Sequence, residues 1–184
     1  MIDFAKVQHD IVSGLQAYLT SINVNCPVIL ANQTAELPDY PYVSFTRINM
    51  IIPDNLHYSV DDDGTKYNDI QQVWSFTTHS ENDAESIRIA GMLYDWFSEI
   101  GHVYHSDNGI IVSTIGNVNN RDNLLTIEYE YRYGLDVTFN LQNLIASPEN
   151  EELIESVTIS YKAEIENEVI KEDEINAETE GRNN

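Results

Sequence analysis

The stretch NVNNRDNLLTIEYEYRYGLDVTFNLQN, residues 117–143, decides the fold. From Leu125 onward every second residue is apolar or aromatic, and most of the residues between them are polar. Because successive side chains of a strand point to opposite faces of a sheet, this alternation predicts one strand over 125–141 with a single apolar face. The strand would be longer than most, so a bulge or bend is expected at Gly134. The apolar face consists of Leu125, Ile127, Tyr129, Tyr131, Tyr133, Leu135, Val137, Phe139 and Leu141.

Two helices are predicted to cover that face. The first begins after Asp3, whose carboxylate can cap the free amides of the first turn, and it extends to about Asn23. The second opens with a capping box formed by Ser80 and Asp83 and ends at Gly101, which suits a left-handed cap. Both have apolar residues at three- and four-residue intervals. These are Phe4, Val7, Ile11, Leu15, Tyr18 and Ile22 in the first helix, and Ile89, Leu93, Trp96 and Ile100 in the second.

Three further strands are predicted before and after the second helix. β-Branched and aromatic residues are dense over 42–52, 70–78 and 110–118, and Pro53 ends the first of these strands. The polar residues 54–69 are expected to form a long hairpin loop between the first two. This order of helix, strands, helix and strands predicts an α+β fold, with two helices packed on a largely antiparallel β-sheet.

Charge divides the chain at Pro148, where a hinge is expected. The 184 residues carry a formal net charge of −22, and the 36 residues after Pro148 hold 12 acidic and 3 basic side chains, or −9 of that total. The predicted domains are therefore an α+β core, 1–147, and an acidic C-terminal extension, 148–184. The extension repeats the alternating pattern at about 153–166, which predicts a strand, and it ends in a polar tail, 171–184.

Charge and composition argue against several classes of protein. A surface that wraps nucleic acid needs clustered Lys and Arg, and the chain has 9 of these against 31 Asp and Glu. The same charge disfavours anionic membranes, and no apolar run is long enough to span a bilayer. The single cysteine, Cys26, provides neither a disulfide framework nor a CxxC motif. Because no signal peptide is recognisable, synthesis and folding in the cytoplasm are expected.

Motifs of catalysis and metal binding are weak. DDDG at 61–64 resembles a calcium loop, but aligning its glycine puts Ser59 first and Ile70 last, where acidic ligands are required. His102 and His105 form an HxxH pair without a third ligand in suitable spacing, so a place in a surface loop is favoured. Phosphate-binding glycine motifs and the GxSxG elbow are absent from the sequence. The sequence therefore predicts no enzyme, no catalytic residue, no metal site and no cofactor.

The polar residues 119–123, NNRDN, precede the alternating strand. Because Asn and Asp tolerate left-handed backbone and bond their own main chain, a tight turn is expected here. Arg121 and Arg132 are two of only six basic residues in the first 148. In so acidic a chain each is expected to pair with a carboxylate, within a subunit or across an interface. An ordinary hairpin with an exposed ion pair is the alternative interpretation.

Three blocks of sequence stand in a characteristic order. They are YPYVSF at 40–45, VWSFTTHSENDAES at 73–86 with DWF at 95–97, and GNVNNRDNLL followed by EYEYRYGLDVTF within 116–139. Together they resemble the neck or tail-terminator proteins of long-tailed double-stranded DNA phages. The resemblance covers roughly residues 1–142, its last block is the most specific, and the extension after Asn143 lies outside it.

The resemblance implies a structural virion protein of the neck or tail, made in the host cytoplasm. Such a small α+β subunit forms a ring, typically a homohexamer, that terminates the tail tube and joins it to the head connector. The partners implied are the tail-tube protein and the connector or adaptor proteins of the head, while DNA passes through the lumen without specific binding. No catalytic residues come with the family. Its motif falls on Asn120, Arg121, Asp122, Tyr129, Tyr131, Arg132, Gly134 and Asp136, expected at turn, core or subunit-interface positions.

An acidic surface suits a ring around DNA, because like charge keeps a polyanion from adhering as it passes. Asp61, Asp62 and Asp63 are the candidates for a loop that faces the lumen. Three alternatives remain at this point: a tail-tube or head-completion subunit, an unrelated acidic binding module that mimics DNA, and a hydrolase that uses His102 and His105.

Overall fold

A computed structural model gives the architecture. It describes residues 2–53, 57–62, 64–125 and 128–145, together with short strands of the extension at 156–160, 164–165, 168–169 and 174–178. The chain separates into two compact units, Met1–Ala146 and Ser147–Asn184. Among the described residues, no helix combines the length and the hydrophobicity needed to cross a bilayer.

The first unit is built on one sheet. Its strands are β1 Val28–Leu30, β2 Tyr42–Pro53, β3 Ser59–Val60, β4 Lys66–Ser80, β5 Ile110–Ile115, β6 Asn119–Asn120, β7 Asn123–Leu125 and β8 Glu128–Ile145. The strand order is β1-β2-β4-β8-β5, with β3 added to β4, and β6 and β7 added to β8. Of these pairings only β1–β2 is parallel, so the sheet is largely antiparallel as expected.

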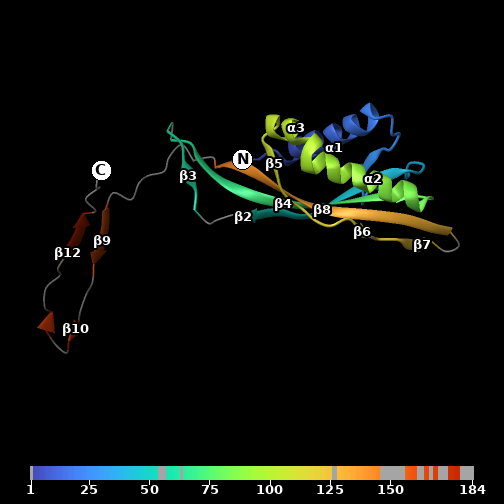
Figure 1. Ribbon diagram of the computed structural model, residues 1–184. Coiled ribbons are helices and arrows are strands. Elements are labelled where there is room, and N and C mark those ends of the chain that lie inside the picture. The colour runs from blue at the N-terminus through green and yellow to red at the C-terminus, as the bar shows by residue number, and fades with distance from the viewer. Residues whose placement is uncertain are drawn as a thin grey trace. The chain divides into compact units, whose positions relative to one another are not determined.

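Helices cover one face of this sheet (Figure 1), and the predicted α+β class is confirmed. They are α1 Phe4–Ser21, α2 Asp83–Asp95 and α3 His102–Asp107, with a π-helical turn, η1 Trp96–Ile100, between the last two. Asp3 caps α1 as predicted, because its carboxylate oxygen Oδ1 accepts from the amides of Ala5 and Lys6, each at 3.0 Å. The helix ends at Ser21, two residues before Asn23, whose φ is 59°.

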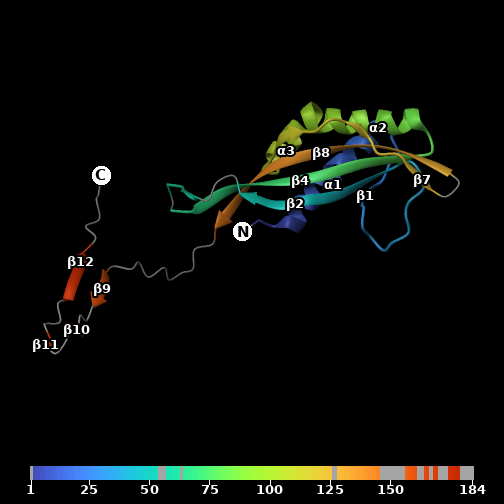
Figure 2. The same cartoon turned by 90° about the horizontal axis from the view of Figure 1, so that it is seen from below.

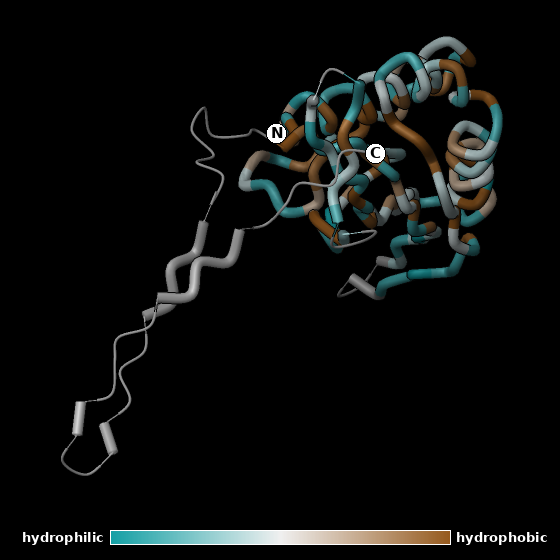
Figure 3. Tube along the Cα trace, turned by 90° about the vertical axis from the view of Figure 1, so that its left-hand side faces the viewer, coloured by the Kyte–Doolittle hydropathy of each residue, from teal (hydrophilic) through white to brown (hydrophobic). Residues whose placement is uncertain are grey.

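The core lies between the helices and the sheet. Along β8, Leu135, Val137, Phe139 and Leu141 are buried, and they alternate with more exposed polar residues. Figure 3 shows hydrophobic and hydrophilic positions interspersed along the chain of the first unit. Aromatic rings from β2, β4, η1 and β8 pack together, and burial of such large apolar surfaces is the main source of stability. Their centroids lie 5.5 Å apart for Phe45–Trp74, 4.7 Å for Phe76–Phe97 and 5.8 Å for Trp74–Phe139.

The prediction of a single long strand over 125–141 is wrong in two respects. Leu125 belongs to β7, which pairs antiparallel with the start of β8, so the two strands form a hairpin; Ile127 lies outside the described residues. The predicted bulge at Gly134 is also wrong, because β8 pairs with β4 in continuous register from Tyr131 to Ile145.

The second helix runs on through η1 to Ile100 and Gly101 caps it, as predicted, but the predicted left-handed form of that cap is wrong. α2 ends at Asp95, the chain continues through η1 and α3, and the φ of Gly101 is −82°, which is not left-handed. A β-carbon at position 101 would lie 2.8 Å from the carbonyl oxygen of Trp96 and 2.9 Å from Nε2 of His105. Glycine is therefore needed here for space. His102 and His105 consequently lie on α3 and not in a surface loop, and His105 is only 2% exposed.

The start of α2 also differs from the prediction. The residue that caps it is Asn82, whose Oδ1 accepts from the amide of Glu85 at 3.0 Å. Ser80 instead donates to the Glu85 carboxylate at 2.6 Å and accepts from the amide of Asn82. The expected capping box of Ser80 and Asp83 is thus wrong, and Asn82 is the N-cap.

The loop expected over 54–69 is shorter than predicted, because β3 pairs with the start of β4. The turn between them is closed by a bond from the amide of Asp61 to the carbonyl oxygen of Thr65, and Gly64 has a φ of 85°. Asp61 and Asp62 are exposed in this turn, and Asp63 lies outside the described residues.

In the second unit, strand β9 Ser156–Ser160 pairs antiparallel with β12 Glu174–Glu178, and β10 Glu164–Ile165 pairs with β11 Glu168–Val169. β9 and β10 lie within the predicted strand region, 153–166, which therefore holds two separate strands. The predicted polar tail, 171–184, contains β12, so this part of it is not simply a solvated chain end. The assignment of a terminator-like core and a separate acidic extension stays a prediction.

Candidate functional site

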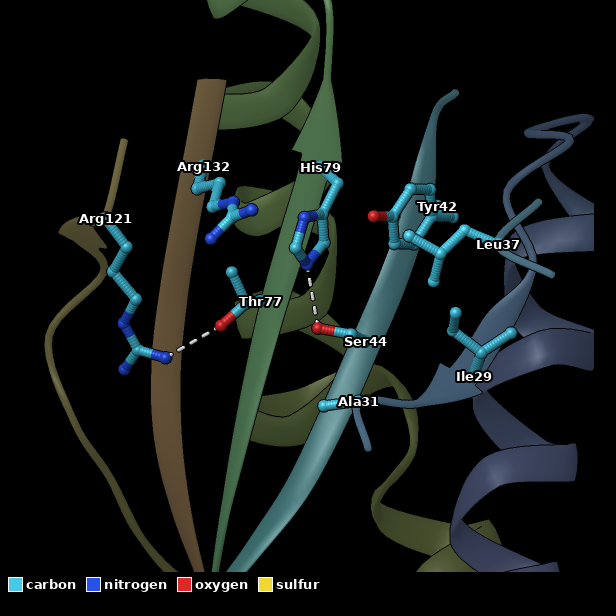
Figure 4. A pocket seen from close by; sticks show the side chains of 9 residues that line it. All are labelled: Ile29, Ala31, Leu37, Tyr42, Ser44, Thr77, His79, Arg121 and Arg132. Carbon is cyan, nitrogen blue, oxygen red and sulfur yellow. Dashed lines mark hydrogen bonds between the residues drawn. The ribbon is translucent and has the colours of Figure 1, made fainter. Parts of the chain in front are cut away.

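The helix-free face of the sheet carries a cluster of polar side chains (Figure 4). The register aligns Tyr42, His79 and Arg132 in one row across β2, β4 and β8, and Ser44, Thr77 and Gly134 in the next. The second row is one residue, and the first row three residues, from the buried row of Phe45, Phe76 and Leu135, and because both spacings are odd the two rows lie on the opposite face. We call this cluster the polar face; it comprises Tyr42, Ser44, Ser75, Thr77, His79, Arg121, Glu130, Arg132 and Asp136.

Arg121 crosses β8 to reach β4. Its segment lies along the edge of β8 that faces away from β4, and its amide donates to the carbonyl oxygen of Arg132 at 2.7 Å. The guanidinium Nη1 donates to Ser75 Oγ at 2.6 Å and to Thr77 Oγ1 at 2.9 Å, and Figure 4 draws the second bond. Nη2 donates to Asp136 Oδ1 at 2.9 Å. One side chain therefore fastens three neighbouring stretches of chain together.

Gly134 makes this crossing possible. A β-carbon at position 134 would lie 2.6 Å from Nη1 of Arg121 and 2.7 Å from the carbonyl oxygen of Phe76, closer than real β-carbons come to other atoms. The strand is regular at this point, so the glycine provides room for the guanidinium and not a bend. Arg121 and Gly134 are therefore required together.

Asp136 is the charged partner of Arg121. Burial by itself would raise the pKa of Asp136, but hydrogen bonds from Ser75, at 2.6 Å, and from Arg121 outweigh it and lower the pKa. The side chains of Asp136 and Arg121 are 47% and 28% exposed, so water screens the pair. Its contribution is therefore about 1 kcal/mol, at the upper end for exposed ion pairs.

Asn120 and Asp122 also help to hold the 119–125 segment against β8. Asn120 donates to Asp122 Oδ2 at 2.7 Å and accepts from the Asp122 amide at 2.9 Å, while Asp122 Oδ1 accepts from the amide of Arg132 at 2.7 Å. The expected tight turn over 119–123 is wrong, because β6 and β7 both run extended along β8. The local Asn–Asp bonding on which that prediction rested is nevertheless present.

Glu130 forms the second ion pair and is only 3% exposed. Its Oε1 accepts from Tyr40 Oη at 2.9 Å and Tyr42 Oη at 3.4 Å, and lies 3.0 Å from His79 Nδ1. Its Oε2 accepts from Nε of Arg132 and pairs with Nη2. Both arginines thus pair with carboxylates of their own subunit, and the Glu130 pair is not the exposed ion pair of the alternative interpretation. A buried carboxylate with this many donors ties β2, β4 and β8 together.

Protonation states in this network follow from its geometry. Burial by itself would raise the pKa of Glu130, but hydrogen bonds from His79, Tyr40 and Arg132 outweigh it and lower the pKa. Burial lowers the pKa of His79 despite its contact with Glu130, so the imidazole is neutral at pH 7. Because an ionised carboxylate only accepts, we assign the ring hydrogen to Nδ1, and Nε2 then accepts from Ser44 Oγ at 2.8 Å.

A pocket of about 330 Å³ opens beside these groups. In space, Ser44, His79 and Glu130 follow one another in the order of a nucleophile, a base and an orienting carboxylate. However, Ser44 lies inside β2, which pairs with strands on both sides, so the nearby amides belong to the sheet and not to an oxyanion site. Tyr42 also stacks on the imidazole, with centroids 4.4 Å apart. The arrangement is that of a structural network. The pocket is lined by Ile29, Ala31, Leu37, Tyr42, Ser44, Thr77, His79, Arg121 and Arg132.

The remaining candidate residues lie elsewhere. Tyr129 is 51% exposed near the β7–β8 hairpin end, and its ring centroid is 5.3 Å from that of Tyr131. Burial raises the pKa of the Cys26 thiol to about 12, so it remains protonated and is a poor nucleophile. Across the part of the chain that the structure describes, no three His, Cys, Asp or Glu side chains gather as metal ligands would.

Replacing Gly134 by Ala tests the crossing of Arg121. We expect Gly134→Ala to lower the free energy of unfolding by about 2 kcal/mol, because the new methyl group meets the guanidinium and a backbone carbonyl. Gly91→Ala is the matched control: nothing lies within 4 Å of that position in α2, so the change should stabilise by about 0.5–1 kcal/mol. Adding Arg121→Ala to Gly134→Ala should recover part of the loss. Urea unfolding measures all three, and equal effects of the two glycine replacements would contradict the geometry.

Acid should weaken the polar face. A carboxylate whose pKa is lowered by folding contributes stability above its unfolded value, about 4.3 for Glu, and loses it as the pH falls through the folded value. We expect Glu130→Gln to cost about 3 kcal/mol at pH 7, since it unpairs a buried charge. It should also flatten the decline of unfolding free energy below about pH 4.3. Urea titrations between pH 7 and 3 test this against Glu99→Gln at an exposed position; a decline of unchanged slope in Glu130→Gln would refute it.

Comparison with known proteins places this chain in a family. The sequence matches the phage neck terminator proteins over residues 9–168, which includes all three sequence blocks from which the resemblance was inferred. The match continues past residue 142, so the expectation that the extension lies wholly outside the family pattern is wrong. No curated protein matches the chain. Proteins of this kind are structural parts of the virion that contact other head and tail proteins. The chain belongs to the phage neck terminator protein family.

Proposed function

We propose that this protein forms a ring, typically a homohexamer, at the head–tail junction, where it terminates the tail tube and joins it to the head connector. Membership of the neck terminator family is the observation that carries the proposal. Its direct partners are then the tail-tube protein and the connector or adaptor proteins of the head, and DNA passes through the lumen without specific binding.

The two edges of the sheet support assembly into a ring. β5 is the last strand on one side. On the other side β1 covers only residues 43–45 of β2, so residues 46–53, which pair with β4 along one edge, have no partner strand along their outer edge among the described residues. Exposed apolar side chains lie along both edges: Ile48 is 50% and Ile51 60% exposed on β2, and Ile111 is 62% exposed on β5. Two different edges favour head-to-tail contacts, the type that closes into rings.

The family motif supports the same assembly. Arg121, Asp122 and Arg132 hold the 119–125 segment against β8, so the β7–β8 hairpin is presented as a firm projection that ends near the exposed Tyr129. We assign the motif residues to the subunit interface on this basis, either in contact with a neighbour or as its support. These are Asn120, Arg121, Asp122, Tyr129, Tyr131, Arg132 and Asp136.

The acidic turn between β3 and β4 is the part that we propose to face DNA. Asp61 and Asp62 are exposed there. Carboxylates on the wall of a channel repel the phosphate backbone, which keeps the transit of DNA free of adhesion.

The oligomeric state tests the proposed ring. The purified chain, alone or mixed with tail tubes, should give a single closed assembly by multi-angle light scattering, and electron images should show it at one end of each tube. Growth into long tubes would instead identify a tube subunit. A chain that stays monomeric and ignores both tubes and connectors would overturn the proposal.

Charge reversal tests the lumen assignment. Phage carrying Asp61→Lys, Asp62→Lys and Asp63→Lys together should assemble but eject DNA more slowly, because the new cations attract the phosphates. The matched control reverses three exposed acids on the helical side, Asp95, Asp107 and Glu99. Ejection timed by release of a DNA-binding dye should slow only in the first variant, and an unchanged rate there would place the turn away from the lumen.

A further inference from the structure

Strand β1 has one side without a neighbouring strand among the described residues. It is the outermost strand on its side of the sheet, next to β2 (Figure 2). Toward β2, the carbonyl oxygen of Pro27 accepts from the amide of Val43 at 2.8 Å. Because the backbone groups of successive residues in a strand point to opposite sides, the amide of Val28 and the carbonyl oxygen of Cys26 point away from β2. Outward-facing groups of this kind are a template on which another chain can add a strand.

Gln16 of α1 binds both of these outward-facing groups. Its Oε1 accepts from the amide of Val28 at 3.0 Å, and its Nε2 donates to the carbonyl oxygen of Cys26 at 3.3 Å. The partners fix the orientation of the side-chain amide, because a backbone N–H only donates and a carbonyl oxygen only accepts. Gln16 is half-buried, and it lines a groove of about 350 Å³ that α1 forms with Val28.

This pair of bonds is the pair that a parallel strand would make. In a parallel ladder, one residue of the added strand donates to the carbonyl oxygen before the residue opposite and accepts from the amide after it. Cys26 and Val28 flank Pro27 in this way, so the side-chain amide of Gln16 lies where a peptide group of a further strand would lie. β1 itself has only three residues, Val28–Leu30, so the two groups are a large part of its outer edge.

The position of Gln16 is held by the core. It belongs to the helix whose residues Ile11, Leu15 and Leu19 are fully buried, so the side chain starts from a fixed backbone. A strand that added here would replace the two bonds of Gln16 and would gain no new ones at these groups. Natural proteins protect exposed sheet edges by covering them, and a helix-borne amide does so here with matched donor and acceptor.

We propose that Gln16 closes the outer edge of β1 against strand addition by a second copy of this chain. Copies in a ring lie close together, so an open β1 would compete with the intended contact. The closure concerns the single subunit, but its consequence rests on the proposed function: contacts between copies are directed to the edges that remain, β5 and the part of β2 beyond residue 45.

Amide exchange in Gln16→Met tests the bonds. Methionine keeps the length of the side chain and a similar helix propensity but lacks the amide. Exchange of the Val28 amide, followed by NMR, should become about tenfold faster, the equivalent of one hydrogen bond. The amides of Val43 and Ala31, which bond between β1 and β2, should be unchanged, and this separates loss of the bond from loss of the fold. Gln8→Met, in the same groove, is the matched control. An unchanged rate at Val28 would overturn the proposal.

Self-association tests the closure. In multi-angle light scattering over a concentration series, Gln16→Met should form additional larger species of mixed size, while the wild-type chain and Gln8→Met keep one size. A single size for Gln16→Met, despite faster exchange at Val28, would overturn the closure and leave the ring standing. A wild-type chain that stays monomeric while Gln16→Met forms larger species would support the closure and count against the ring.

Discussion

The guanidinium of Arg121 passing over Gly134 is the constraint on which the rest of this structure depends. A side chain from the edge of β8 can reach Ser75 and Thr77 of β4 only because no β-carbon stands between them. The crossing fixes the 119–125 segment to the sheet, and it thereby sets the position of the β7–β8 hairpin. The polar residues Asn120, Arg121, Asp122 and Asp136 therefore share one task, which is to hold a projecting part of the subunit in a defined place.

The buried Glu130 network serves the same purpose in the neighbouring row of the sheet. It joins Tyr42 of β2, His79 of β4 and Arg132 of β8 on a carboxylate that is 3% exposed. A polar network in which every group has a hydrogen-bond partner contributes more to rigidity and to a unique strand register than to stability. Rigidity suits a structural part of the virion that contacts other head and tail proteins. The nearness of Ser44 to His79 follows from this packing.

The sequence predicts the periodic features of this fold well, because period is a local property. α1, its cap at Asp3 and the buried face of β8 from Leu135 to Leu141 follow directly from spacing. The polar face could have been anticipated from Ser75, Thr77 and His79 at period two. Which partners these side chains meet, Arg121 for Ser75 and Thr77 and Glu130 for His79, depends on the β4–β8 register, which spacing does not define. Gly134 and Gly101 were misread for a related reason. Gly134 is required by Arg121, which is distant in sequence, and Gly101 by His105, which lies beyond the expected helix end. The conformational preference of a single residue contains no such information.

The central claim is that copies of this chain close into a ring at the end of the tail tube. A cryo-electron microscopy reconstruction of the neck in intact virions tests it most directly, since it views the assembly with its own partners and with DNA in place. The account predicts a single closed ring of this α+β subunit between the tube and the head connector, with free sheet edges of adjacent copies in contact. A neck whose rings are all formed by other chains, with this subunit absent or present as an isolated copy, would contradict it.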